Sequence, residues 1–297
     1  MQSLNFAFRF INACFSLALK HKRLRNPWLI LWMGGVAILV LGMIPFVAVI
    51  ILVGMTQLSV ALIGLFSILL LFAVLAWGEV SASETCQAFF YTLNQAEEIA
   101  PETEIPGPEF VRWQDVFMWF LIQPGLAVIR LFKKIFQGEK GNQEAWLTAS
   151  YLTVPVIRIE NLSQVEAVER VKQIFKDHLL RVHLDLVGVR PVAGMIQWLF
   201  ILVGGVLGLW VGRIIADPVT GGVLSRMLGI ALGILLAGVL ALLGIFFSSF
   251  TRACYYTSLY QWVLNVESAR RSGETSQGAP PAILSRVMGK PKPNKKE

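Results

Sequence analysis

Long apolar runs without any charged residue alternate along this chain with segments in which charged and apolar residues recur at helical spacing. The charge-free intervals are 26–78, 191–212 and 227–251. Because a helix needs about 20 apolar residues to cross a bilayer, the first interval predicts two spans and each later interval predicts one. The expected spans are about 28–52, 57–78, 192–212 and 228–250.

Two apolar segments in the middle of the chain are shorter, and each contains a proline. They lie within 110–136 and 145–157 and hold apolar runs of about 13–14 residues. Pro124 and Pro155 interrupt helical hydrogen bonding, and broken backbone at membrane depth is tolerated only where protein or water covers it. We therefore expect two short or broken helices that pack against the four spans, with Arg158 at the lipid headgroups.

Two amphipathic helices are predicted outside the spans. Residues 1–25 place an apolar stretch before a basic cluster, the reverse of a signal peptide, and indicate an interfacial helix. Residues 163–185 carry apolar positions at helical spacing and begin with Ser163 and Glu166, the pattern of a capping box. Glu166 and Arg170 are also spaced as an i,i+4 ion pair. We expect this second helix to lie on the cytoplasmic side.

Small residues recur every fourth position in the last two predicted spans. They are Gly204, Gly208 and Gly212 in the first of these spans, and Gly229, Gly233, Ala237 and Ala241 in the second. Lipid provides no hydrophobic drive for helix association, so such faces allow close backbone approach instead. The short connecting loop favours a tight hairpin within one chain, and a homodimer face is the alternative.

Composition places the whole chain in the membrane class. Hydrophobic residues make up 55% and charged residues 15%, against roughly 45–50% and 25% in globular proteins, and the mean hydropathy is +0.62. The predicted fold is an all-α, polytopic transmembrane helical bundle over 26–265, followed by a basic disordered tail over 266–297. Tyr255, Tyr256, Tyr260 and Trp262, after the last span, resemble an interfacial aromatic belt.

Charge sets the expected orientation. The basic cluster before the first span places the N-terminus in the cytoplasm, and an even number of spans returns the C-terminus to the same side of a prokaryotic cytoplasmic membrane. Anionic headgroups are the expected partner of these basic segments, whereas nucleic acid is not expected. The acidic stretch 79–115 either pairs with the basic N-terminal helix or forms a solvated loop.

No motif for catalysis, cofactor binding or metal binding occurs in the sequence. The four spans contain no ionisable residue, which argues against an ion-coupled pump. Cys14, Cys86 and Cys254 are far apart in sequence and have no metal or disulfide spacing, so we expect small buried apolar side chains. His178 and His183 are five residues apart, a poor spacing for a helical metal pair.

The chain resembles an uncharacterised family of multi-span bacterial and archaeal integral membrane proteins. The resemblance is carried by Asn26-Pro27 before the first span and by Arg252, Ala253 and Tyr255 after the last. It is also carried by Trp146, Ala149, Tyr151, Val154, Pro155 and Val156, with Glu166-Ala167 following them. The long acidic, proline-rich link at 96–109 departs from the family pattern. The resemblance implies a roughly six-helix membrane protein and no known activity.

Three functions remain open from the sequence. The first is a non-enzymatic scaffold, assembly or regulatory component, with a membrane-protein partner or a homo-oligomer. The second is a small-solute or lipid transporter or channel that uses the broken segments 116–129 and 145–157. The third is lipid-directed enzymology, which would need an interfacial acid or base such as Asp115, Glu144 or His178.

Overall fold

The structure, a computed structural model, describes residues 2–53, 57–96, 151–176, 189–216, 223–272 and 280–288. This part of the chain is helical with short connections and contains no strand, which confirms the all-α class. The helices are α1 (Gln2–Lys20), α2 (Lys22–Val53), α3 (Gln57–Ala96), α6 (Gln164–Lys176), α7 (Val189–Ile215), α8 (Val223–Arg271) and α9 (Ala282–Met288). A further helical segment covers 151–160.

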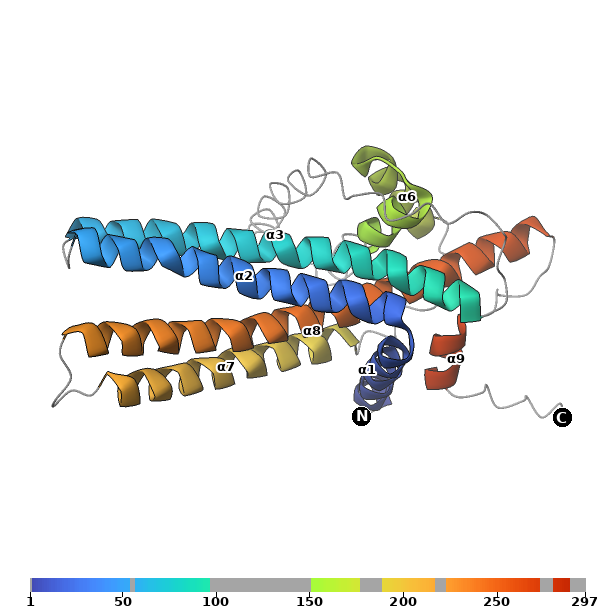
Figure 1. Ribbon diagram of the computed structural model, residues 1–297. Coiled ribbons are helices and arrows are strands. Elements are labelled where there is room, and N and C mark those ends of the chain that lie inside the picture. Colours follow the sequence, from blue (N-terminus) through green and yellow to red (C-terminus); the bar gives the residue numbers. More distant parts are fainter. Residues whose placement is uncertain are drawn as a thin grey trace, which may run out of the picture.

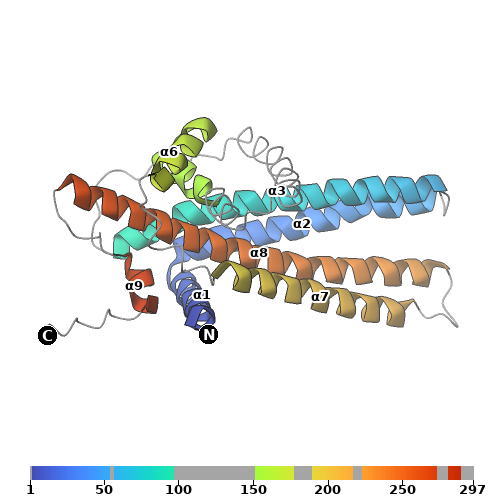
Figure 2. The ribbon, with the colours of Figure 1, turned by 180° about the vertical axis from the view of Figure 1, so that it is seen from behind.

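Four long helices form the stem of the molecule (Figure 1). Hairpin α2–α3 lies beside hairpin α7–α8, and both α2 and α3 contact α8, as Figure 2 shows from behind. Within the described residues, two stretches are long and apolar enough to cross a membrane, Pro191–Ile215 in α7 and Gly229–Arg271 in α8. The apolar stretches Trp32–Pro45 and Ala61–Leu70, in α2 and α3, are shorter.

Helix α8 is much longer than a membrane is thick. Its 49 residues extend about 73 Å at 1.5 Å per residue, whereas a hydrocarbon core measures about 30 Å. The 40 residues of α3 extend about 60 Å. Both helices therefore continue well beyond the stem.

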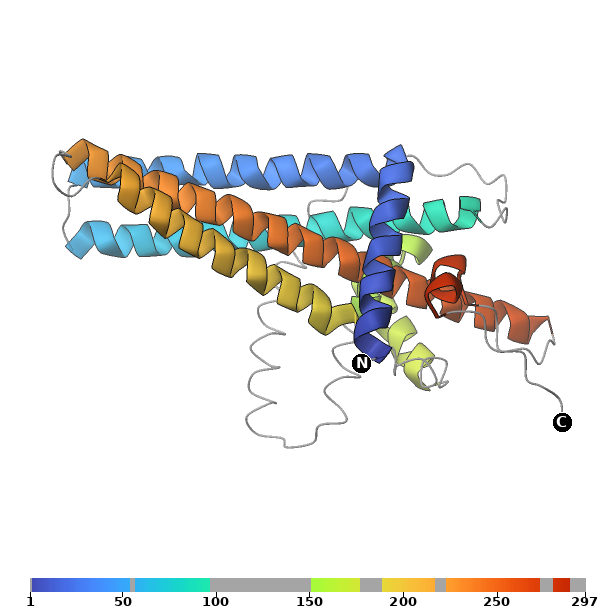
Figure 3. The ribbon, with the colours of Figure 1, turned by 90° about the horizontal axis from the view of Figure 1, so that it is seen from below.

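These extensions form the centre of a compact second region, which we call the platform. It consists of α1, the segment 151–160, α6, α9, residues 82–96 of α3 and residues 247–271 of α8. These parts share one hydrophobic core, in which Phe10, Phe89, Leu152, Ile174, Tyr260 and Leu284 are almost completely buried. Figure 3 shows α1 crossing the stem helices where the stem meets the platform.

Three sequence expectations are wrong within the platform. Tyr255, Tyr256, Tyr260 and Trp262 do not form an exposed aromatic belt, because each is at most 7% exposed in the platform core. The tail is not disordered throughout, because α8 continues to Arg271 and α9 buries Ile283, Leu284 and Val287. The described half of the segment 145–157 is not broken at Pro155 and packs in the platform core, where Leu152 and Val156 are 0% exposed.

The surface of the stem differs from that of the platform. Large apolar side chains are exposed along the stem, among them Met33, Leu41, Leu65, Leu69, Trp198, Leu202, Leu209 and Trp210, all at least 53% exposed. Far fewer are exposed on the platform, mainly on α1 and at the start of α6. The molecule thus combines a stem with an apolar exterior and a platform with a closed apolar core.

Candidate functional site: contacts of the stem and the platform

The glycines predicted in the last two apolar stretches bring the backbones of α7 and α8 into contact. A Cβ atom built on Gly208 would lie 2.3 Å from the carbonyl oxygen of Gly233, and one on Gly229 would lie 2.5 Å from the carbonyl oxygen of Gly212. A Cβ on Gly204 would lie 2.8 Å from Leu240 Cβ. The expected hairpin is confirmed, because this glycine face is used within the chain.

The junction between the segment 151–160 and α6 is built from two local signals. Asn161 has a φ of 52°, the left-handed conformation that Asn tolerates better than most residues and that ends helices. Ser163 then starts α6 through the predicted capping box: its amide donates to Glu166 Oε2 at 2.9 Å, and its Oγ accepts from the Glu166 amide at 3.4 Å. The hydroxyl and the amide of Ser163, which lie beside the Glu166 carboxylate, lower the pKa of Glu166 below its usual value.

Arg158 joins the segment 151–160 to α3. Its guanidinium donates to Ser83 Oγ at 2.9 and 3.1 Å and pairs with Glu84 Oε1 at 3.2 Å. Burial raises the pKa of Glu84, and the charge of Arg158 opposes that rise. The side chain predicted at the lipid headgroups therefore makes an internal contact of the platform, and Glu84 pairs with this segment.

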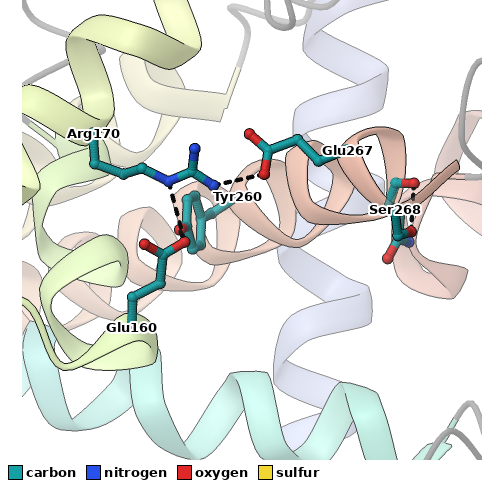
Figure 4. Close-up of polar contacts among 6 residues, drawn as sticks. Glu160, Arg170, Tyr260, Glu267 and Ser268 are labelled. Atoms are coloured by element: carbon teal, nitrogen blue, oxygen red, sulfur yellow. Dashed lines mark hydrogen bonds and ion pairs between the residues drawn. The ribbon is translucent and has the colours of Figure 1, made fainter. Parts of the chain in front are cut away.

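Arg170 forms the second ionic contact, shown in Figure 4. Its Nε lies 3.3 Å from Glu160 Oε1, and its second guanidinium nitrogen lies 2.6 Å from Glu267 Oε2. Tyr260 donates its hydroxyl to Glu160. The predicted pair of Arg170 with Glu166 is wrong, because Arg170 turns toward α8 and Glu166 completes the capping box instead.

Two residues of this ionic contact, Arg170 and Tyr260, have raised pKa values. The hydrogen bond from Glu267 raises the pKa of Arg170 above its usual value, with Glu160 adding to the effect. Burial and the bond to Glu160 raise the pKa of Tyr260, so Tyr260 remains a donor near neutral pH. The group therefore ties together the segment 151–160, α6 and α8 as a fixed ion-pair network.

Tyr151 makes a third contact between the segment 151–160 and α8. Its ring stacks on Tyr256 with a centroid distance of 5.0 Å and an interplanar angle of 15°. Arg252 donates to the Tyr151 hydroxyl at 3.2 Å, and the Arg252 guanidinium carbon lies 5.7 Å from the Tyr151 ring centroid. Pro155 is buried in the same segment.

The three cysteines meet in the platform core, although they are distant in sequence. Cys14, Cys86 and Cys254 come from α1, α3 and α8, and each is at most 1% exposed. Burial raises the pKa of the Cys254 thiol, and the neighbouring Cys14 and Cys86 add to the rise. Cys86 Sγ lies 3.9 Å from the Ala253 carbonyl oxygen. The expectation of small buried side chains is confirmed, and their convergence was not predicted.

Several predicted positions lie outside the described residues. These are Pro124, Trp146, Asp115, Glu144, His178, His183 and the segment 116–129. In the described ranges, no group of three or more His, Cys, Asp or Glu side chains is arranged to hold a metal ion. The contacts found there are ion pairs, hydrogen bonds and ring stacks that join helices.

The sequence did not predict the contacts of Glu84, Glu160 and Glu267, and it placed Tyr260 in an aromatic belt instead of this network. Their partners are distant in sequence: Arg170 and Glu267 are 97 residues apart, and Tyr260 and Glu160 are 100 apart. A charged residue inside an otherwise apolar helical face is the signal that could have identified Arg170, which follows the buried Ala167 and precedes the buried Val171.

Comparisons with known proteins identify no relative: no family model, no curated protein and no solved structure matches this chain. The resemblance to an uncharacterised membrane-protein family therefore stays a prediction.

Proposed function

We propose that this chain is a non-enzymatic integral membrane protein that crosses the membrane four times and holds the platform at the cytoplasmic face as a scaffold, assembly or regulatory component. The four spans are α2, the first half of α3, α7 and the first half of α8. The exposed apolar side chains of all four helices support this placement, as does the absence of charge from residues 26–78 of the sequence.

Charge supports a cytoplasmic platform. The first 25 residues contain five basic residues and no acidic residue. The opposite end of the stem carries only Arg213, Asp217 and Arg226 between the last two spans. Basic residues near spans remain on the cytoplasmic side, so both termini belong there with the platform.

The observation that carries the scaffold role is the continuity of α8. This single helix is part of the stem at Gly229 and Gly233 and part of the platform core at Tyr260. The platform is therefore joined rigidly to a membrane anchor. Arg158 and Arg170 in the platform form ion pairs that hold its helices together. These charges therefore stabilise the fold.

The packing of the segment 151–160 weighs against transport. A midplane transport site would need this segment to line a wet cavity among the spans. Instead Thr153 is 5% exposed, and Leu152 and Val156 are fully buried in the platform. A scaffold is the function that dry packing favours.

Crosslinking in membranes tests the scaffold role. A cleavable crosslinker applied to cells that express the tagged protein should yield a partner in constant stoichiometry. The variant Leu284→Asp, which charges a 0% exposed position of α9, should lose that partner while remaining in the membrane. Solute flux through liposomes that contain the purified protein, or a constant absence of partners, would contradict the proposal.

Thiol labelling of intact cells tests the orientation. Gln57 begins α3 at the far end of the stem, and Lys20 ends α1 in the platform, and both are exposed. A membrane-impermeant maleimide should label Gln57→Cys and not Lys20→Cys, and the three native cysteines should stay silent because they are buried. Labelling of Lys20→Cys alone would reverse the orientation.

A further inference from the structure

Helix α1 has three distinct faces. The first is buried against the platform and includes Ala7, Phe10, Cys14 and Ala18, at most 9% exposed. The second is an apolar strip in which Leu4, Phe8 and Leu19 are 51%, 51% and 72% exposed. The third is polar and exposed, and it comprises Asn5, Arg9, Asn12, Ser16 and Lys20. The apolar strip is the face that needs a partner.

Two ring contacts show which way the strip faces. Phe10 lies edge-on to Tyr255 at 5.6 Å, whereas Phe15 stacks on Phe247 at 4.9 Å and also contacts Phe250. Tyr255 lies eight residues after Phe247, about 12 Å farther from the stem along α8. The Phe15 side of α1 therefore faces the stem, and the Phe10 side faces the platform.

The apolar strip lies on the Phe15 side. At about 100° per residue, Leu4, Phe8 and Leu19 fall within about 40° of Phe15 around the helix. The strip is thus directed toward the end of the molecule where the exposed surface of α2 and α7 is apolar, and α1 contacts both helices. The strip continues that apolar surface instead of standing alone.

The charged residues on the polar face beside the strip are basic. Arg9, Lys20 and Lys22 are exposed, and the first acidic residue of the chain is Glu79. A basic residue beside an anionic lipid surface increases affinity about five-fold at moderate salt. An amphipathic helix with this distribution is typical of one that lies in the plane of the interface.

We propose that α1 is a lipid-binding element that inserts Leu4, Phe8 and Leu19 among the acyl chains of an anionic leaflet and places Arg9 and Lys20, with Lys22 at the start of α2, near the phosphates. The proposal rests on the membrane-spanning stem of the proposed function. It does not depend on a scaffold partner. The occupant of the strip is phospholipid, because the strip faces the same side as the apolar exterior of the stem and the charged residues on the polar face of α1 are all basic.

Fluorescence quenching of the full-length protein in liposomes tests this proposal. The buried native thiols allow a single exposed cysteine to be labelled with an environment-sensitive dye, at Phe8→Cys or Leu19→Cys in the strip and at Ser16→Cys on the polar face as the control. The liposomes contain phosphatidylcholine and phosphatidylglycerol in a 7:3 ratio. A dye at Phe8→Cys or Leu19→Cys should be quenched by nitroxide-labelled lipid and protected from iodide. A dye at Ser16→Cys should be quenched by iodide and not by nitroxide-labelled lipid.

Each other outcome overturns the proposal. Iodide quenching at both strip positions would mean that the strip faces water. Protection from both quenchers would mean that protein covers the strip, as in docking of a second copy of this chain. The contribution of the basic residues is tested by energy transfer from the protein to labelled lipid. The double variant Arg9→Gln with Lys20→Gln should lower the ratio of transfer to labelled phosphatidylglycerol over labelled phosphatidylcholine at least two-fold. An unchanged preference would remove the anionic lipid from the proposal, and labelling of Gln57→Cys checks the stem separately.

Discussion

Replacing Gly208 by alanine should weaken the α7–α8 hairpin, whereas the same change at Gly205, three residues earlier in α7, should not. The new Cβ atom at position 208 would lie 2.3 Å from the carbonyl oxygen of Gly233 and 2.9 Å from Ala237 Cβ. The first distance is about 1.1 Å short of the 3.4 Å at which ordinary contact begins. Since the nearest atom is backbone, the helices themselves must move apart.

The magnitude follows from two opposing contributions. Overpacking a well-packed contact costs about 1–3 kcal/mol, while Gly→Ala within a helix gains up to about 1 kcal/mol from backbone propensity. At Gly205 a Cβ atom meets nothing within 4 Å, so only the second contribution applies. We therefore expect Gly208→Ala to be less stable than Gly205→Ala by about 1–3 kcal/mol.

The assay is reversible unfolding by SDS in mixed micelles, followed by far-UV circular dichroism and by reactivity of the buried thiols. The variant Gly233→Ala provides an internal check, because its Cβ would lie 2.5 Å from the Gly208 carbonyl oxygen in the same contact. The two substitutions share one interface, so their effects should not add. Equal stabilities of Gly208→Ala and Gly205→Ala would refute the glycine contact.

Four further predictions concern the platform. Arg170→Ala should lower the free energy of unfolding by about 2–3 kcal/mol, because it leaves Glu160 and Glu267 without a cation. Lys172→Ala, on the exposed side of α6, should leave the free energy of unfolding unchanged in the same SDS titration. Tyr260→Phe should cost less, about 1–2 kcal/mol, because Glu160 keeps its pair with Arg170; a loss as large as that of Arg170→Ala would contradict this ranking. The three native thiols should react with maleimide only after unfolding, since all are buried. Leu284→Ala, expected to lower the free energy of unfolding by about 2–5 kcal/mol, should make them reactive at a lower SDS fraction than in wild type. Labelling of the native wild type would exclude a closed core. Because the folded state lowers the pKa of Glu166, its contribution is present above the unfolded value near 4.5 and is lost as the pH falls through the lower folded value. Amide exchange in the first turn of α6, corrected for intrinsic rates, should therefore increase over that range in wild type but not in Glu166→Gln, which has no carboxyl group to titrate.

Features that depend on neighbouring residues could be predicted from the sequence. The all-α class, the glycine hairpin and the start of α6 at Ser163 each follow from spacing within a few residues or between two consecutive helices. These patterns determine local structure directly because the interacting atoms are close in the chain.

Features that depend on tertiary contacts could not be predicted in this way. The aromatic residues after position 250 have the composition of a membrane-interface belt, and only the packing of α1, α6 and α9 around α8 makes them a core. Arg170 had an acceptable local partner in Glu166, but Glu160 and Glu267 compete for it across the fold. The convergence of Cys14, Cys86 and Cys254 has no local signal at all.

The packing of α1 against the far end of the chain has a consequence for biosynthesis. Phe10 contacts Tyr255, and α1 also contacts α9, so α1 is made well before two of its partners. At 5–20 residues per second, the 245 residues between Phe10 and Tyr255 take about 12–50 s to synthesise. During that interval Phe10 lacks its ring partner, and a chain that stops before α8 is complete cannot close the platform core. Assembly of the platform therefore requires that translation has passed α9.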